Sequence, residues 1–181
     1  DTTLSEKRNI QVRVKTVTGD IIFPEAGGFS LKSEENVIFP FNLNMNGINL
    51  KYATAQLLMK GDDANNPYYV FFAPEGIQPQ FSFGSDALVD VGIGATTDKK
   101  GNRLLVKCEE GVAEFTVSLN GRNRTRVLVL PKSLALQSYV VTLNGRKHLM
   151  FSDAIVLQDG NSFTLLSDGK NSYSLSVYQL Y

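Results

Sequence analysis

Polar and apolar residues alternate along much of the chain with the period of two that a half-buried strand requires. The alternation is clearest in three runs, at residues 10–14, 113–119 and 173–177. In each run one face is apolar and the other is polar or charged, which is typical of antiparallel sheets with one face on a core. Helical periodicity is nearly absent. The best helix candidate is the run 131–137, which begins with a proline and holds at most two turns.

Turn signals separate these runs about every ten residues, as in sandwiches and barrels. Asn-Gly and Asp-Gly dipeptides stand at 46–47, 120–121, 144–145, 159–160 and 168–169. These residues supply the positive φ angles that tight hairpin turns need. We therefore predict an all-β fold, an antiparallel β-sandwich or two packed β-sheets with at most one short helix. We expect strand above about 40% and helix below about 10%, far from the averages of globular proteins.

The chain has 181 residues, the length of one domain, and no proline-rich or low-complexity linker divides it. We predict a single β-rich domain over residues 1–181, with a soft boundary near residues 92–102, where the sequence is polar and glycine-rich. That segment is either a crossing between two sheets or the tip of a long hairpin, and the tip is the favoured interpretation. The chain opens on Asp1 without a leader peptide. We therefore expect either a trimmed chain or a piece cut from a longer protein.

Composition and charge narrow the possible partners. Hydrophobic residues make up 43% of the chain, which excludes wholesale disorder. The 18 basic and 18 acidic side chains cancel, so no global charge attracts the chain to nucleic acid or to an anionic membrane. No apolar run approaches the roughly 20 residues that span a bilayer. Cys108 is the only cysteine, which excludes an intrachain disulfide and multi-cysteine zinc sites. Its strand-like surroundings predict a buried, inert thiol.

Catalytic and cofactor motifs are also missing. His148 is the only histidine, whereas Ser-His-Asp sites and catalytic zinc sites need a suitably placed base or several ligands. Because it follows two cations, we interpret it as a surface or strand-edge residue. Gly92 and Gly94 form a Gly-x-Gly without the third glycine of a dinucleotide fingerprint. We predict no catalytic residue, no cofactor site and no metal site.

Clustered charges are interpreted as solvated or salt-bridged. The carboxylate doublets are Glu34-Glu35, Asp62-Asp63 and Glu109-Glu110. Neighbouring residues of a strand point to opposite faces, so a doublet is not itself a catalytic pair. The arginines Arg122, Arg124 and Arg126 would share one face of a strand, and no aromatic platforms for bases lie between them. We expect Glu109, Glu110 and Glu114 to neutralise them across a hairpin rather than nucleic acid to bind there.

Aromatic residues offer candidates for contact with a neighbouring domain. The chain has no Trp, and its densest aromatic cluster lies at residues 67–74, where alternation leaves both strand faces apolar. This pattern predicts an interior strand, or a strand with one face on the core and one on another domain. The candidate interdomain contacts are Phe39, Phe41, Tyr68, Tyr69, Phe71 and Phe72.

Several segments together resemble a known family. They are residues 37–44, 50–58, 69–77, 127–130, 149–154 and 158–160. In this order they are similar to the β-rich region that follows the catalytic barrel in large bacterial family 35 glycoside hydrolases, the β-galactosidases. In that family the catalytic glutamates lie in the barrel, and nothing here matches the barrel. The resemblance implies a non-catalytic accessory domain whose partner is the catalytic domain. It also implies a periplasmic, secreted or cell-surface bacterial setting.

Two other functions stay open. A carbohydrate-binding module would take a galactoside-containing glycan as its partner, and the lack of Trp counts against it. A free-standing cell-surface β-sandwich would be encoded without a catalytic barrel on either side. The length of the full gene product distinguishes this last possibility from the accessory domain.

Overall fold

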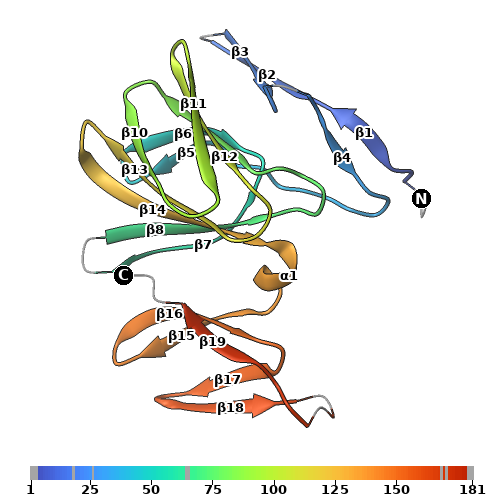
Figure 1. The fold of residues 1–181 in the computed structure, drawn as a ribbon, viewed down its shortest axis with the longest axis vertical. Coiled ribbons are helices and arrows are strands. Elements are labelled where there is room, and N and C mark those ends of the chain that lie inside the picture. Colours follow the sequence, from blue (N-terminus) through green and yellow to red (C-terminus); the bar gives the residue numbers. More distant parts are fainter. Residues whose placement is uncertain are drawn as a thin grey trace.

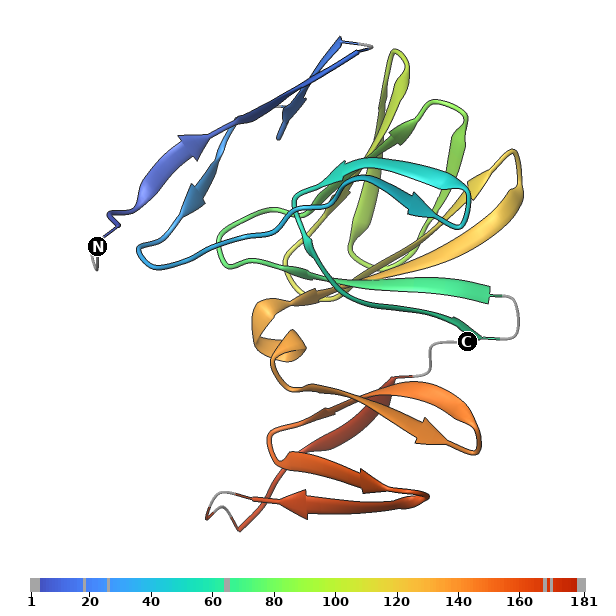
Figure 2. The same cartoon turned by 180° about the vertical axis from the view of Figure 1, so that it is seen from behind.

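The computed structural model describes residues 4–17, 19–25, 27–63, 66–167, 169 and 171–178. Strands make up 65% of these described residues, and the helix found among them is the single turn α1 (Lys132–Ala135). The predicted all-β fold is therefore confirmed. Figures 1 and 2 show three parts in chain order: an N-terminal ribbon, a two-sheet sandwich and a C-terminal unit.

The sandwich consists of two five-stranded sheets. Sheet 1 has the order β10 (Ala87–Val91), β13 (Ala113–Leu119), β14 (Arg122–Pro131), β8 (Asn66–Ala73) and β7 (Gln56–Asp63). Sheet 2 has the order β11 (Ala95–Lys100), β12 (Arg103–Cys108), β9 (Gln80–Gly84), β6 (Ile48–Ala53) and β5 (Phe41–Met45). The described pairings are antiparallel apart from β8 with β14, which run parallel at the centre of sheet 1.

The inner faces of the two sheets share one hydrophobic core. Phe71, Phe81 and Phe115 are fully buried there, and their ring centroids lie 5.0 and 5.3 Å apart in edge-to-face pairs. This geometry matches the negative face of one ring to the positive edge of the next. Cys108 is buried in the same core, as predicted, and burial raises the pKa of its thiol to about 12. An uncharged thiol at every physiological pH is a weak nucleophile.

The N-terminal ribbon consists of two short antiparallel pairs. They are β1 (Lys7–Ile10) with β4 (Phe29–Leu31), and β2 (Val12–Thr16) with β3 (Gly19–Phe23). The strand expected at residues 10–14 is thus divided at Gln11. The Gln11 side chain donates its Nε2–H to the carbonyl oxygen of Pro24 at 3.2 Å.

The ribbon attaches to the outer face of sheet 2. Phe23 stacks on the fully buried Tyr52, with ring centroids 4.8 Å apart, and Leu105 joins them in a second core cluster. Arg103 forms an ion pair with Glu25 at 3.0 Å beside this cluster. Aromatic stacking and one partly buried ion pair therefore hold the ribbon against the sandwich.

In the C-terminal unit a three-stranded sheet packs against a hairpin. The sheet has the order β15 (Ser138–Leu143), β16 (Arg146–Ser152) and β19 (Leu175–Tyr178), and the hairpin joins β17 (Ile155–Asp159) to β18 (Ser162–Leu166). Leu149 and Phe151 of β16 pack with Tyr68 on the outer face of sheet 1. Met150, on the other face of β16, packs with Val156 of the hairpin. β16, the central strand of the small sheet, is therefore buried on both faces from His148 to Ser152.

Three Asn-Gly dipeptides form the turns that they predict. Asn46 and Gly47 have φ of 54° and 85° between β5 and β6. Asn120 and Gly121 have φ of 50° and 74° between β13 and β14, and Asn144 and Gly145 have 51° and 77° between β15 and β16. Two successive positive φ angles are typical of the type I′ turn, whose twist matches that of the strands. At residues 159–160 only Gly160 has a positive φ, 56°. Part of the turn expected at 168–169 lies outside the described residues.

The soft boundary at residues 92–102 lies inside the sandwich. Residues 92–94 cross from β10 in sheet 1 to β11 in sheet 2, and residues 101–102 form the tip of the β11–β12 hairpin. The segment therefore contains both alternatives, and its interpretation as a hairpin tip holds only for its last part. Gly92 permits the crossing, because an added Cβ would lie 2.7 Å from the backbone oxygen of Glu114.

Two expectations for the C-terminal unit are corrected. His148 is neither on the surface nor at a strand edge but buried in β16. Its cross-strand partner Val141 belongs to the cluster under the β17–β18 hairpin, so this face of the sheet is covered. The strand expected at residues 173–177 is β19, which starts at Leu175. Leu175 and Val177 remain about half-exposed, so its apolar face is only partly covered.

Candidate functional site

The six candidate contact residues all pack within this chain. Tyr68 is buried between sheet 1 and the C-terminal unit, whereas Tyr69 and Phe71 are buried in the core between the two sheets. β8 is thus an interior strand with both faces covered, the first of its two predicted roles. Phe72 is half-buried at the edge of the outer cluster.

Phe39 and Phe41 lie beside the N-terminal ribbon. Both are half-buried against the cluster of Phe23 and Tyr52. The ring of Phe39 also meets Phe29 edge to face, with centroids 5.5 Å apart. The structure therefore gives all six side chains intramolecular partners. Their contact with another domain stays a prediction.

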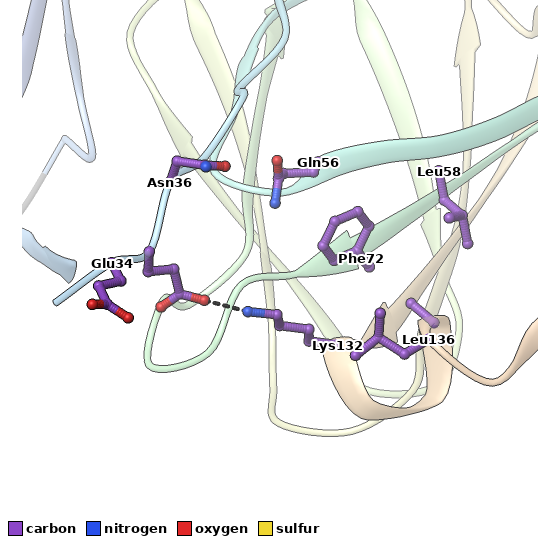
Figure 3. Close-up of a pocket in the computed structure, with 9 residues that line it drawn as sticks. Glu34, Asn36, Gln56, Leu58, Phe72, Lys132 and Leu136 are labelled. Atoms are coloured by element: carbon purple, nitrogen blue, oxygen red, sulfur yellow. Dashed lines mark hydrogen bonds and ion pairs between the residues drawn. The ribbon is translucent and has the colours of Figure 1, made fainter. Parts of the chain in front are cut away.

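A first hollow, called the Phe72 pocket, lies where the chain after β4 passes sheet 1 and α1 (Figure 3). Its volume is about 450 Å³. Phe72 and Leu58 supply apolar surface, and the amides of Gln56 and Asn36 face the same space. The Gln56 Oε1 accepts a hydrogen bond from the backbone N–H of Ile38 at 2.9 Å. This bond fixes the amide, and Figure 3 shows its nitrogen turned toward the pocket.

Two ion pairs fasten the segment after β4 to the base of the sandwich. Lys132 of α1 donates to Glu35 at 2.5 Å, the contact marked by the dashed line in Figure 3. Lys32 pairs with Glu75 on the loop between β8 and β9. This pairing lowers the pKa of Glu75 and raises that of Lys32, through the hydrogen bond and the opposite charges. The Lys32–Glu75 pair is largely exposed, so it fixes position more than it adds stability, whereas Glu35 of the other pair is mostly buried.

A second hollow, called the proline groove, adjoins the first at Lys132 and Leu136. It has a volume of about 830 Å³, within the range of ligand and peptide sites. Its apolar lining comes from three loops and α1, and consists of Pro74, Ile77, Pro79, Cys108, Pro131 and Leu136. Glu75, Glu109 and Glu110 are exposed at its rim. The groove is therefore apolar inside and predominantly acidic at its edge.

One backbone hydrogen bond and two bonds of the Thr54 side chain hold the loops around the groove in place. The Cys108 N–H donates to the carbonyl oxygen of Pro79 at 2.9 Å, which ties the β8–β9 loop to β12. On the other side, the Thr54 Oγ1 donates to Gln78 and accepts from the Gln80 N–H, both at 2.8 Å. The groove is pre-formed, so a partner would lose little entropy in ordering it.

A polar network joins sheet 1 to the C-terminal unit. Arg126 Nε donates to Glu114 Oε1 at 2.6 Å, and an Arg126 amino group donates to the Tyr178 hydroxyl at 3.0 Å. Tyr178 in turn donates to Glu114 Oε2. Burial would raise the pKa of Glu114, but the hydrogen bonds from Arg126 and Tyr178 outweigh it and lower that pKa. Burial and the bond to Glu114 raise the pKa of Tyr178 to about 12.

The arginine stripe is thus only partly neutralised as expected. Arg126 pairs with Glu114 across β13 and β14, as predicted. Arg124 instead pairs weakly with Asp90 at 3.8 Å. Glu109 and Glu110 do not reach the stripe, because they belong to the loop at the proline groove.

The described residues bring no other chemistry together. Within that part of the chain, no group of three or more His, Cys, Asp or Glu side chains is arranged to hold a metal ion. None of its helices has the length and apolar character of a membrane span. Of the doublets, Glu35 is ion-paired, while Asp62 is exposed and the Asp63 side chain lies outside the described part.

Sequence reasoning missed the proline groove and the ion pair at its edge. The prolines at 74, 79 and 131 and the doublet at 109–110 are visible in the sequence. They lie far apart along the chain and meet only because one end of the sandwich gathers three loops and α1. The exposure of Leu136 could have been suspected, since it follows a very short helix at the edge of an apolar run.

Comparison with known proteins agrees with this architecture. No curated protein matches the chain. Residues 1–154 match the family described as beta-galactosidase, domain 2, a stretch that includes the ribbon, the whole sandwich and the first two strands of the C-terminal unit. The chain therefore belongs to the family of beta-galactosidase domain 2 and is an accessory domain of a beta-galactosidase.

Proposed function

We propose that this domain belongs to a family 35 glycoside hydrolase and acts by packing on the catalytic barrel, without catalysis of its own. The match over residues 1–154 to a domain of β-galactosidases carries the proposal, because such a domain implies a catalytic domain in the same enzyme. The resemblance of the sequence to family 35 enzymes supports the finer assignment. A rigid sandwich with pre-formed loops suits a structural role.

If the domain packs on the barrel, the two should unfold together when the whole enzyme is heated. Two domains that share a substantial interface unfold together, whereas weakly attached domains unfold separately. Calorimetry of the full β-galactosidase should give one transition for the barrel and this domain, at a temperature above the midpoint of the 181-residue chain. A separate transition at the midpoint of the isolated chain would contradict the packing.

The absence of catalysis can be tested directly. Glycoside hydrolysis in most families needs two carboxylic groups facing each other across the scissile bond, one as acid and one as nucleophile or base. In the described part of this chain the partly buried Glu114 and Glu35 are each bound to a cation. The purified 181-residue chain should hydrolyse a chromogenic β-galactoside no faster than the blank. Turnover abolished by changing one carboxylate would contradict this.

A carbohydrate-binding role is a second candidate, and the Phe72 pocket favours it. A half-buried ring beside two amides, of which Gln56 is fixed by a backbone hydrogen bond, offers a sugar an apolar surface for its ring faces and polar partners for its hydroxyls. Titration of the 181-residue chain with a β-galactoside would show binding that Gln56→Ala weakens. A Gln158→Ala variant is the control, because this glutamine also bonds backbone but lies in the β17–β18 hairpin. Equal affinities for both variants, or no binding, would exclude the pocket.

The cellular setting is part of the same proposal. Enzymes that degrade external galactosides act outside the cytoplasm, so we place the parent enzyme in the periplasm or at the surface of a bacterium, or secreted from it. Fractionation of cells that express the full gene would test this. Activity confined to the cytoplasmic fraction would contradict it.

A further inference from the structure

We propose that the proline groove and the exposed apolar side chains beside it form the surface on which the catalytic domain of the parent enzyme docks. The occupant is a segment that carries branched aliphatic side chains next to a lysine or an arginine. This inference rests on the proposed function, since it names the face through which the domain packs.

Exposed apolar surface at the groove is the first observation that supports docking of the catalytic domain there. Leu136 is 77% exposed although it is one of the apolar residues that line the groove. Contact with an aliphatic side chain of a partner would remove both Leu136 and the proline-lined floor from water. The floor is already rigid, so little ordering opposes that contact.

The apolar surface continues beyond the groove. The segment 109–114 is bonded to the crossing between the sheets: the Glu109 N–H donates to the Gly94 oxygen, and the Glu114 N–H to the Ile93 oxygen, both at 2.8 Å. Ile93, 74% exposed, and the partly exposed Val112 therefore add apolar surface beside the groove. Contiguous exposed apolar side chains with a polar rim mark interaction sites on soluble proteins.

Charge identifies the occupant. Glu75 and Lys132 at the rim are compensated within the chain, by Lys32 and Glu35 respectively. Glu109 and Glu110 form no ion pair with any residue in the described part of the chain, so the uncompensated charge at the rim is negative. A complementary partner therefore presents a cation beside its apolar side chains. A neutral sugar has no cation to pair with these carboxylates, and no aromatic ring on which a sugar could stack is among the described lining residues.

The experiment uses the full β-galactosidase that contains this chain. Two double variants change the surface: Glu109→Lys with Glu110→Lys reverses the charge, and Leu136→Ser with Ile93→Ser removes the apolar side chains. Matched controls are Asp86→Lys with Asp159→Lys, and Val140→Ser with Leu157→Ser, at exposed positions away from the groove. The readout is the rate of protease cleavage at the junction with the catalytic domain.

Each surface variant should raise this cleavage rate by about tenfold, the effect of losing one interface anchor. The controls should be cleaved at the wild-type rate. Surface variants cleaved at the wild-type rate, or controls cleaved as fast as the surface variants, would overturn the proposal. The same substitutions in the 181-residue chain should leave its unfolding midpoint unchanged. A lowered midpoint would show that these side chains stabilise the fold, which also overturns the proposal.

Two further measurements separate this inference from the proposed function. If the wild-type enzyme unfolds as one unit but the surface variants remain coupled, the domain packs through another face and only this inference fails. If the wild-type domain unfolds independently of the barrel, the packing itself fails. Sedimentation of the 181-residue chain tests for a second copy: a dimer abolished by Glu109→Lys with Glu110→Lys would make that copy the occupant and contradict the proposal.

Discussion

The linkage of Glu114, Arg126 and Tyr178 is the best-defined polar interaction between the sandwich and the C-terminal unit. Each side chain is partly buried, and each bonds the other two. The guanidinium of Arg126 also lies 5.5 Å from the centroid of the Tyr178 ring. Hydrogen bonds to charged groups are stronger than neutral ones, and a partly buried charge that loses its partner is costly. The ionised Glu114 carboxylate therefore contributes to holding Tyr178 of β19 against the sandwich, beside the pairing of β19 with β16.

Replacing Glu114 with Gln should destabilise the chain by about 2 kcal/mol at pH 7, as expected for charged hydrogen bonds. The lowered pKa of Glu114 means that its ionic contribution is present above the ordinary value of 4.5 and is lost as the pH falls through the lowered value. The stability difference between wild type and variant should therefore narrow below pH 4.5. Urea unfolding at a series of pH values would measure this.

Asp90→Asn provides the control for that series. Its ion pair with Arg124 is long and largely exposed, so the change should be within about 0.5 kcal/mol at any pH. A difference between wild type and the Glu114→Gln variant that stays constant down to pH 3 would contradict the assigned ionic contribution.

Residue-level prediction from sequence succeeded where neighbours in the chain determine neighbours in space. The pairing of Glu114 with Arg126 follows from a two-residue turn at Asn120 and Gly121, which fixes the register of β13 and β14. Tyr178 joins this pair from the far end of the chain, and nothing local indicates it. The burial of His148 was missed because a hairpin that follows it in sequence covers its face of the sheet.

At the scale of elements, the crossing between β10 and β11 depends on close approach of two backbones. The Gly92 N–H donates to the Glu114 oxygen at 2.9 Å, and no room remains for a side chain on that face. Gly92→Ala should destabilise the chain by about 1–3 kcal/mol, because the backbone itself must move. Thermal or urea unfolding of the two proteins gives the value.

Gly84→Ala is the matched control for this prediction. Its added Cβ would meet only the carboxylate end of Asp86, an exposed and flexible side chain that can rotate away. The change should lie within about 0.5 kcal/mol of zero. An equal loss of stability in both variants would show that the crossing has no special requirement for glycine.

The positions of strands and turns were predicted better than the pairing of the strands in the sheets. Alternation located β13 and β2, and Asn-Gly dipeptides located three hairpins, because both signals are local. The parallel pairing of β8 with β14 has no local signal, and neither does the choice of sheet for each strand. For the same reason the aromatic run at 67–74 predicts either an interior strand or a strand that faces another domain, and nothing local indicates that the C-terminal unit covers its outer face.

At the scale of the whole molecule, the family match ends at residue 154, between β16 and β17. The hairpin and β19 beyond it supply Val156 to the small core and Tyr178 to the interface with the sandwich. A chain that ends at residue 154 should keep the sandwich folded but lose order in β15 and β16. Among the described residues, none beyond β14 belongs to the core between the sheets.

Amide hydrogen exchange on the shortened chain would check this prediction. Strong protection should persist in β8, β9 and β13, while the amides of β15 and β16 exchange close to the rate of unfolded peptides. Protected β15 and β16 would show that two strands and the outer face of sheet 1 are enough. Loss of protection throughout would show that sandwich and C-terminal unit fold as one cooperative body.

The parallel pair in the middle of sheet 1 has a consequence for biosynthesis. It joins residues 68–73 to residues 126–131, so β8 must wait for every strand from β9 to β13 to be synthesised before its second neighbour exists. Closing such a long loop is slow, because its entropy is lost before the contact forms. During that interval β8 exposes apolar side chains and an unpaired edge, which is a template for association between nascent chains. Ribosome pauses between β8 and β14 would prolong this interval, so the yield of soluble protein should depend on the speed of translation there.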